Sequence, residues 1–137
     1  STIINLTNKP TLLRFGGLEI SKIEKILKKK ISININSKKK IAPGQFTLHY
    51  SPGVPLRVNV KKSKSNEAFV LIKKRNINSK NYYYLSKKKN LKEAAKNLYS
   101  ILRKIKKDGY KMIAVEKIPN IGIGKTINDR LNRASKY

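Results

Sequence analysis

The stretch from residue 90 to residue 109 most constrains the fold, because its apolar residues recur at the spacing of one helical face. The apolar positions are Leu91, Ala94, Ala95, Leu98, Ile101, Leu102 and Ile105. Asn90 is a favoured N-cap residue, Glu93 lies where a capping box places its acidic residue, and Gly109 suits the position just beyond a helix end. These signals predict an amphipathic helix with lysine and arginine on its opposite face.

Strand-like segments lie on both sides of this helix. They are residues 54–60, 68–72, 82–85 and 112–118, which are rich in β-branched and aromatic side chains. A final helix is predicted after Gly124, with Ile127, Leu131 and Ala134 facing inward. Strand, helix, strand and helix in this order imply a right-handed crossover and at least one parallel strand pair. We therefore predict an α/β fold, with a small Rossmann-like domain of mostly parallel sheet and flanking helices over residues 54–137.

The sequence of the amino-terminal part predicts only short elements. Residues 2–6 and 11–14 resemble two short strands, residues 19–28 have helical spacing, and residues 31–41 suggest an extended arm rather than a central strand. Two strands alone are not stable in water. Residues 1–28 therefore form a block without a core of its own, and we expect residues 29–53 to be a linker.

The centre of this linker has an unusual composition. Pro43 fixes its own φ and restricts the residue before it, while Gly44 permits a sharp bend, so residues 42–52 follow a defined non-helical path. The same segment contains His49, the only histidine of the chain, and Tyr50 beside it. These two side chains could donate to or stack on a ligand. The alternative is an ordinary loop that packs on its neighbour.

Composition excludes several kinds of site. The 137 residues include no cysteine, which excludes disulfides, a thiolate zinc site and a cysteine nucleophile. The 7 acidic residues form no pair flanking one likely pocket, and His49 has no second ligand beside it, so we predict neither a catalytic residue nor a metal site. No apolar run reaches membrane-spanning length and the amino end lacks a charged leader, so we expect a cytoplasmic protein without a signal peptide.

The net charge of +26 has two explanations. A strongly basic chain is typical of proteins that bind nucleic acid. The excess is mostly lysine, however, and it accompanies much isoleucine and asparagine, which all have AT-rich codons. Codon bias would place such charge on any solvated surface. Weak non-specific tRNA binding is expected as a by-product in either case. The tyrosines of residues 82–84 could stack on bases, but strand alternation is expected to send at least one of their rings into the core.

The carboxy-terminal third contains two further patterns. The run Gly-Ile-Gly-Lys-Thr at residues 122–126 looks like a phosphate-binding loop, but Pro119 occupies the position where that motif needs its first glycine. The preferred explanation is a tight strand-to-helix turn, although the helix terminus could hold an anion. Asp129 and Arg133 are spaced for a common intrahelical ion pair worth only tenths of a kcal/mol, roughly 0.2–0.5.

Taken together, four segments resemble the carboxy-terminal part of long-form threonylcarbamoyl-AMP synthases. Ser-Thr-Ile-Ile-Asn-Leu at residues 1–6 and Leu-Arg at residues 13–14 are similar to the end of the YrdC-like catalytic domain, although Phe15 replaces the family's proline. Pro-Gly-Gln at residues 43–45 and His-Tyr-Ser-Pro at residues 49–52 are similar to the linker of the family. Residues 91–98 and 121–134 are similar to its two carboxy-terminal helical motifs.

The resemblance implies a function for the chain. The family makes threonylcarbamoyl-AMP from L-threonine, bicarbonate and ATP for tRNA modification, with Mg²⁺ as cofactor. By analogy, Ser1 would contact threonine or nucleotide and Arg14 the ATP phosphates, while Pro43, Gly44, Gln45, His49 and Tyr50 would belong to a lid over the pocket. ATP and Mg²⁺ would be bound mainly by an N-terminal YrdC-like catalytic domain, so this segment alone would be an inactive part of a nucleotidyltransferase.

Two other functions fit the sequence. One is a basic RNA-binding accessory module, in which lysine-rich faces and residues 82–84 contact tRNA. The other is a non-catalytic remnant that only stabilises a partner. A steep salt dependence of RNA binding would favour the first of these.

Overall fold

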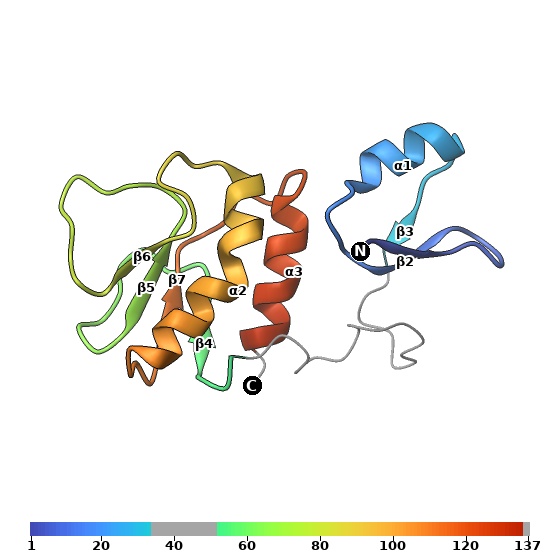
Figure 1. Ribbon diagram of the computed structural model, residues 1–137. Helices are drawn as coiled ribbons and strands as arrows, with labels where there is room; N and C mark the ends of the chain where they lie inside the picture. The colour runs from blue at the N-terminus through green and yellow to red at the C-terminus, as the bar shows by residue number, and fades with distance from the viewer. Residues whose placement is uncertain (34–51, 136–137) are drawn as a thin grey trace.

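The computed structural model describes residues 1–33 and 52–135, and these residues form two sheets with three helices (Figure 1). The elements in chain order are β1 (Ile3–Asn5), β2 (Thr11–Arg14), α1 (Ile20–Leu27), β3 (Ser32–Ile33), β4 (Leu56–Arg57), β5 (Ala68–Leu71), β6 (Tyr82–Tyr84), α2 (Leu91–Lys107), β7 (Ile113–Val115) and α3 (Gly124–Ser135). The first sheet has the order β1-β2-β3, and the second has the order β4-β7-β5-β6.

The second sheet is parallel throughout. β7 pairs with both β4 and β5, and β5 pairs with β6, all in parallel register. β7 lies between β4 and β5 because the chain returns from β6 through α2 to the middle of the sheet. Figure 1 shows α2 and α3 side by side over one face of this sheet. The predicted α/β fold with a mostly parallel sheet and flanking helices is confirmed.

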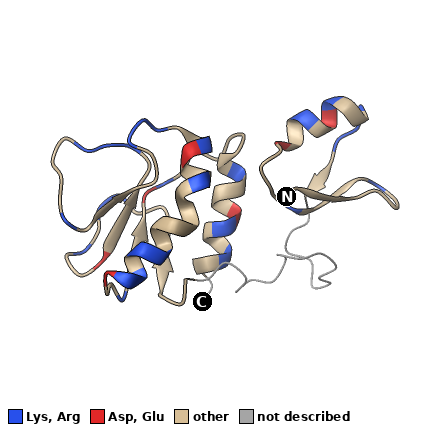
Figure 2. Cartoon of the chain, in the orientation of Figure 1, with Lys and Arg blue, Asp and Glu red and all other residues tan. Residues whose placement is uncertain are grey.

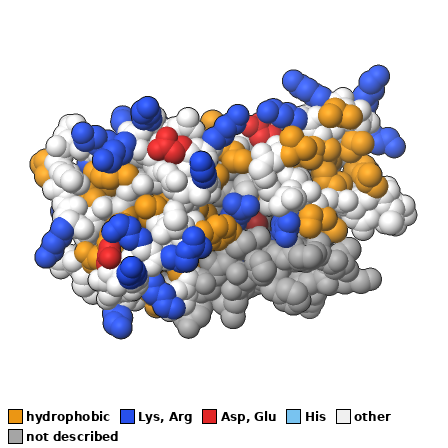
Figure 3. Space-filling view, viewed as in Figure 1, with side chains coloured by type: hydrophobic (Ala, Val, Ile, Leu, Met, Phe, Trp, Pro, Cys, Tyr) orange, Lys and Arg blue, Asp and Glu red, His pale blue; other side chains and the backbone are white. Residues whose placement is uncertain are grey.

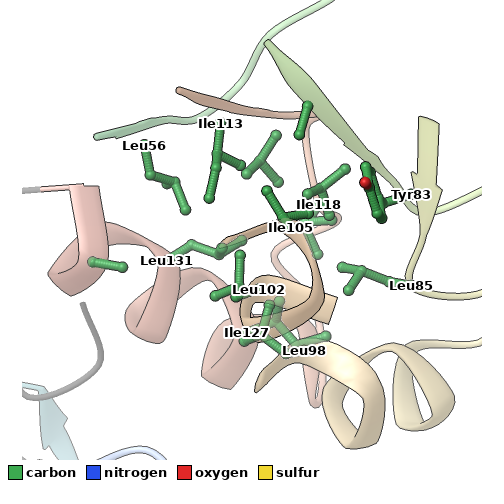
Figure 4. Packing of buried hydrophobic residues seen from close by; sticks show 14 of the residues in the cluster. Leu56, Tyr83, Leu85, Leu98, Leu102, Ile105, Ile113, Ile118, Ile127 and Leu131 are labelled. Carbon is green, nitrogen blue, oxygen red and sulfur yellow. The ribbon is translucent and has the colours of Figure 1, made fainter. Parts of the chain in front are cut away.

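The main core lies between this sheet and the two helices. Figure 4 shows its side chains, and the labelled members are Leu56, Tyr83, Leu85, Leu98, Leu102, Ile105, Ile113, Ile118, Ile127 and Leu131. Leu98 and Ile105 of α2 and Ile127 of α3 are fully buried there, as the helical spacing predicts. Tyr83 points into this core, while Tyr82 and Tyr84 pack against a smaller cluster. The expectation that alternation buries one of these rings is therefore confirmed.

The smaller cluster covers the opposite face of the sheet. Its buried members are Val60, Phe69, Leu71 and Ala114, which alternate along their strands with the residues that face the helices. Arg75 lies over the Phe69 ring, with 5.4 Å between its guanidinium carbon and the ring centroid. Both faces of the sheet are thus apolar, as is usual for parallel sheets.

Glu67 is a carboxylate with no solvent exposure on the edge of this cluster. Its two oxygens accept bonds from the Arg57 guanidinium at 2.6 and 2.7 Å, and Oε1 also accepts the Lys64 N–H at 2.8 Å. The hydrogen bonds from Arg57 hold the pKa of Glu67 below its usual value, against the opposing effect of burial. The folded state therefore favours the charged carboxylate.

Changing Glu67 to glutamine is expected to lower the free energy of unfolding by roughly 1.5–3 kcal/mol at neutral pH, because charge-assisted bonds become neutral ones. A lowered folded-state pKa gives stability above the usual glutamate pKa of about 4.3, and this stability is lost as pH falls through the folded value. The difference between the two proteins should therefore shrink below about pH 4. Urea titrations at several pH values measure the free energy of unfolding of both proteins. Exposed Glu93→Gln is the control, and its free energy of unfolding is expected to change by no more than about 0.5 kcal/mol.

The predicted helix ends match the structure with one exception. The Asn90 side chain accepts the Glu93 N–H at 3.1 Å, and Gly109 has a φ of +91° beyond the last turn. The Asn90 N–H, however, donates to the Ser86 hydroxyl at 3.0 Å instead of to Glu93. β4 is also shorter than the predicted strand over residues 54–60, since Asn59 adopts a left-handed φ of 58° that no strand continues through.

The first sheet is small and packs against α1. β1 and β2 are antiparallel, and β3 adds to β2 in parallel, so the extended stretch predicted from residue 31 begins as an edge strand. The buried apolar residues of this unit are Leu12, Phe15, Ile20 and Ile31. α1 ends at Leu27, and the C-cap residue Lys28 has a left-handed φ of 53°. The division into residues 1–28, 29–53 and 54–137 stays a prediction.

Candidate functional site

Arg14 and Ser1, the two predicted site residues of the amino-terminal unit, lie next to each other. Arg14 ends β2 and lies opposite Ile3 of β1. Its Nε donates to the Ser1 carbonyl oxygen at 2.9 Å. This bond helps to orient the guanidinium, whose forked donors suit phosphate or carboxylate oxygens.

Gly16 brings the loop after β2 against the start of the chain segment that holds Ser1. A Cβ at Gly16 would lie 2.0 Å from the Thr2 backbone nitrogen and 2.2 Å from the Ser1 carbonyl carbon. Such distances are far inside van der Waals contact, so only glycine permits this approach. The close packing of the two backbones therefore helps to hold Ser1 near Arg14.

α3 presents a polar face in addition to the apolar face that covers the sheet. Thr126, Asp129, Arg130 and Arg133 recur at helical spacing along it. The Thr126 hydroxyl donates to the Gly16 carbonyl oxygen at 2.6 Å, and this bond is buried. α3 thus connects the parallel sheet directly with the loop that follows Arg14.

Asp129 and Arg133 form the predicted ion pair, with 3.1 Å between Oδ2 and Nε. The two side chains are only 4% and 8% exposed, so this intrahelical pair is buried. Buried ion pairs cost more to desolvate and lose more when one partner is removed. The sequence spacing indicates the pair but not what covers it.

Arg130 lies between the two units of the chain. Its guanidinium carbon is 5.5 Å from the centroid of the Tyr99 ring in α2. The positive charges of Arg14 and Arg130 both act on the backbone position of Ser1. Arg14, Arg130 and Ser1 therefore share one positively charged environment, which we call the arginine site.

The glycine-rich run at residues 122–126 contacts the amino-terminal unit. Gly122 has a φ of +51°, and a Cβ there would lie 3.1 Å from a carboxylate oxygen of Glu19. The Thr126 hydroxyl, which would face Mg²⁺ in a phosphate-binding loop, bonds to Gly16 instead. The geometry favours the tight strand-to-helix turn over a nucleotide loop.

Sequence reasoning missed Arg130 and Thr126 as parts of the arginine site. The sequence feature that could have pointed to them is the polar stripe on α3. In the structure, residues on the polar side of α3 are buried as well as those on its apolar side. Pro43, Gly44, Gln45, His49 and Tyr50 lie outside the described residues. Within residues 1–33 and 52–135, no group of three or more His, Cys, Asp or Glu residues could hold a metal ion. In the same ranges, no helix has the length and apolar character needed to cross a membrane.

Comparison with known proteins identifies the family. Residues 18–136 match the family described as threonylcarbamoyl-AMP synthase, C-terminal domain. The chain belongs to this family. The threonylcarbamoyl-AMP synthase of Pyrococcus abyssi is 31% identical over the whole chain, and the match covers 46% of that relative. The chain thus spans about half the length of the curated relative that it matches.

Two solved structures share the fold of this threonylcarbamoyl-AMP synthase domain. The crystal structure of P. abyssi Sua5 complexed with L-threonine is 28% identical, with a TM-score of 0.80 over all of this chain and 46% of that chain. A variant of P. abyssi Sua5, with one histidine and one tyrosine changed to alanine, is 25% identical with a TM-score of 0.74, over all of this chain and 45% of that chain. These matches include the amino-terminal unit as well as the parallel sheet.

Proposed function

We propose that this chain is the carboxy-terminal part of an L-threonylcarbamoyladenylate synthase. The complete enzyme would join L-threonine, bicarbonate and ATP into threonylcarbamoyl-AMP, releasing diphosphate and water, and would supply this adenylate for tRNA modification in the cytoplasm. The observation that carries the proposal is the family match over residues 18–136. The L-threonine complex of the P. abyssi protein supports threonine as the amino acid substrate.

The arginine site would contribute to substrate binding. The bond to the Ser1 carbonyl oxygen orients the Arg14 guanidinium, and we propose that Arg14 contacts the phosphates of ATP. Ser1 would contact threonine or the nucleotide. Arg130 adds a second positive charge near Ser1, which would favour an anionic substrate there. Both arginines would stabilise negative charge on phosphate oxygens during nucleotidyl transfer.

The linker would act as a lid over this site. The proposal rests on Pro43, Gly44, Gln45, His49 and Tyr50, which lie outside the described residues. His49 and Tyr50 are an adjacent histidine and tyrosine, and the solved P. abyssi variant changes one residue of each kind. A closed lid would exclude water from an adenylate that hydrolyses readily.

A further catalytic portion would bind most of the ATP and the Mg²⁺. The described residues do not fit a resident Mg²⁺, because they contain no cluster of carboxylates, and Asp129 is engaged by Arg133. The amino-terminal unit also exposes large apolar side chains, with Leu6, Ile26 and Ile33 between 53% and 80% exposed. Such surface suits packing against the rest of a YrdC-like catalytic domain. The segment alone would accordingly be inactive.

The proposal predicts that diphosphate release appears only when this chain is combined with a YrdC-like catalytic domain. Calorimetry of ATP with L-threonine and Mg²⁺, together with a diphosphate assay, would measure binding and turnover with and without that domain. Turnover by the mixture supports the proposal. A folded mixture that neither binds ATP nor releases diphosphate would contradict it.

Replacing Arg14 by alanine in this mixture is expected to reduce kcat/KM at least tenfold, because a fixed fork of phosphate donors is lost. Arg14→Lys should recover only part of the activity, since an ammonium cannot form the same paired bonds. Exposed Arg103→Ala removes one guanidinium from α2 and is the matched control, with kcat/KM expected to stay within about twofold. Equal activities of the Arg14 and Arg103 variants would remove Arg14 from the site.

A further inference from the structure

Lysines gather at the carboxyl edge of the parallel sheet, where β5 and β6 end. They are Lys73, Lys74, Lys87, Lys88, Lys89 and Lys92, all of which are exposed, and we call them the lysine ridge. Lys73 and Lys88 form an isolated antiparallel bridge, and the Lys74 N–H donates to the Lys87 carbonyl oxygen at 3.4 Å. Residues from two separate loops are therefore held side by side at the edge where α/β sheets commonly bind ligands.

The ridge has more lysines than there are acidic residues near it. Within residues 52–135 the carboxylates of Glu67, Asp108, Glu116 and Asp129 form ion pairs with Arg57, Lys104, Arg75 and Arg133 respectively, none of which belongs to the ridge. Glu116 lies at this edge and also accepts the Ile72 N–H at 3.0 Å. Glu93 follows Lys92 in the first turn of α2, and Glu19 lines the same hollow as Lys89 and Lys92. The ridge therefore presents a local excess of positive charge to solvent.

Aromatic rings lie directly behind the lysines. The Lys87 ammonium is 5.9 Å from the centroid of the Tyr84 ring, and Tyr84 meets Tyr82 edge to face at 6.5 Å. Both tyrosines are partly exposed on the sheet face that carries no helix. Lysines interleaved with accessible aromatic rings are typical of surfaces that track a nucleic acid backbone and tolerate different bases.

The basic surface continues past the amino end of α2. Lys89 and Lys92 line a hollow of about 440 Å³ together with Glu19 and the turn before α3. Figure 2 shows Lys and Arg in the loop between β6 and α2, and Figure 3 shows blue side chains gathered over the same corner. The lysines thus run from the ends of β5 and β6 to the first turn of α2.

We infer that the lysine ridge binds the sugar-phosphate backbone of RNA. Lysine supplies flexible point charges that contact phosphate without reading base edges, so the binding is independent of sequence. An RNA backbone fits better than an anionic membrane, because the ridge is built from loops and a single helical turn and lacks an amphipathic helix with a lipid-facing side.

Binding of a fluorescein-labelled RNA hairpin to the complete 137-residue chain, measured by anisotropy over a salt series, tests the inference. A ridge variant carries glutamine at Lys73, Lys74, Lys88 and Lys92. A matched variant at the opposite edge carries glutamine at Lys80, Lys106, Lys107 and Lys111, which are also exposed. Both remove the same charge, so they separate the effect of position from that of net charge.

The ridge variant is expected to bind at least tenfold more weakly, and its slope of log K against log salt should fall by about 3. The opposite-edge variant should stay within about threefold of the unmodified chain and keep most of its slope. Restoring charge with arginine at the four ridge positions should restore binding, which shows that folding is intact. Equal losses in the two variants, or no hairpin binding by the unmodified chain, would overturn the inference.

Vesicles of phosphatidylglycerol and phosphatidylcholine provide the last arm of the test. Ridge-dependent binding to these vesicles with no binding to the hairpin would also overturn the inference, in favour of a membrane surface. None of these measurements needs ATP, threonine or the catalytic domain. Failure of RNA binding and failure of the proposed synthase activity are therefore distinguishable.

Discussion

Changing Gly124 to alanine is expected to disrupt the start of α3 and destabilise the carboxy-terminal domain by at least about 3 kcal/mol, the upper end of overpacking effects. A Cβ at this position would lie 1.9 Å from the Pro119 carbonyl oxygen, which belongs to backbone and has no rotamer to change. α3 would have to move away from the turn that follows β7. Because Ile127 and Leu131 of α3 fill the main core, such a movement would open that core.

Urea unfolding followed by far-UV circular dichroism measures this effect. The neighbouring Lys125→Ala variant is the control, since Lys125 is an exposed helix residue and its loss should change stability by less than about 0.5 kcal/mol. Similar unfolding free energies for the two variants would contradict the close approach of Gly124 to Pro119.

Changing Gly16 to alanine is expected to separate the loop after β2 from Ser1 and Thr2. The added Cβ would meet two backbone atoms within 2.2 Å, so either β1 or the loop must shift, at a cost of about 3 kcal/mol or more. The shift would disturb the Arg14 bond to Ser1 and the Thr126 bond to Gly16. Under the proposed function, kcat/KM of the combined enzyme should fall at least tenfold.

The adjacent glycine provides a sharp comparison. A Cβ at Gly17 would meet no atom within 4 Å, so Gly17→Ala should fold and function nearly as the unmodified chain does. Hydrogen exchange of the β1 amides and the diphosphate assay would report the two effects separately. If the two alanine variants gave the same exchange and the same rate, the Gly16 contact would not be what holds Ser1 near Arg14.

Much of the fold could be predicted from local patterns. The stripe of apolar residues from Leu91 to Ile105, its N-cap at Asn90 and the glycine at position 109 predicted α2 correctly, because these signals act within the helix itself. The alternation along residues 82–84 likewise predicted that at least one ring is buried, and the structure buries Tyr83. Sequence alone could not give the strand order, since β4 and β7 pair across residues far apart in the chain.

Less of the arginine site could be predicted, because it is made by contacts between the two units. Arg14 and Ser1 followed from resemblance to a family, and the structure brings them together without testing their roles. Arg130 and Thr126 were missed, since a polar stripe on a helix usually faces solvent. Here that stripe faces the loop at Gly16. The roles of Pro43, Gly44, Gln45, His49 and Tyr50 stay predictions.

The position of β7 between β4 and β5 also has a consequence for how the domain folds. β4 and β5 both pair with β7, so neither can form that pairing until residues 113–115 have been made. Before then, β5 can pair only with β6. During synthesis, β4 would therefore stay unpaired until more than half of its domain has left the ribosome. Such late, non-local pairing slows folding and exposes strand edges to aggregation. Chaperone dependence and slow refolding are the costs expected of this strand order.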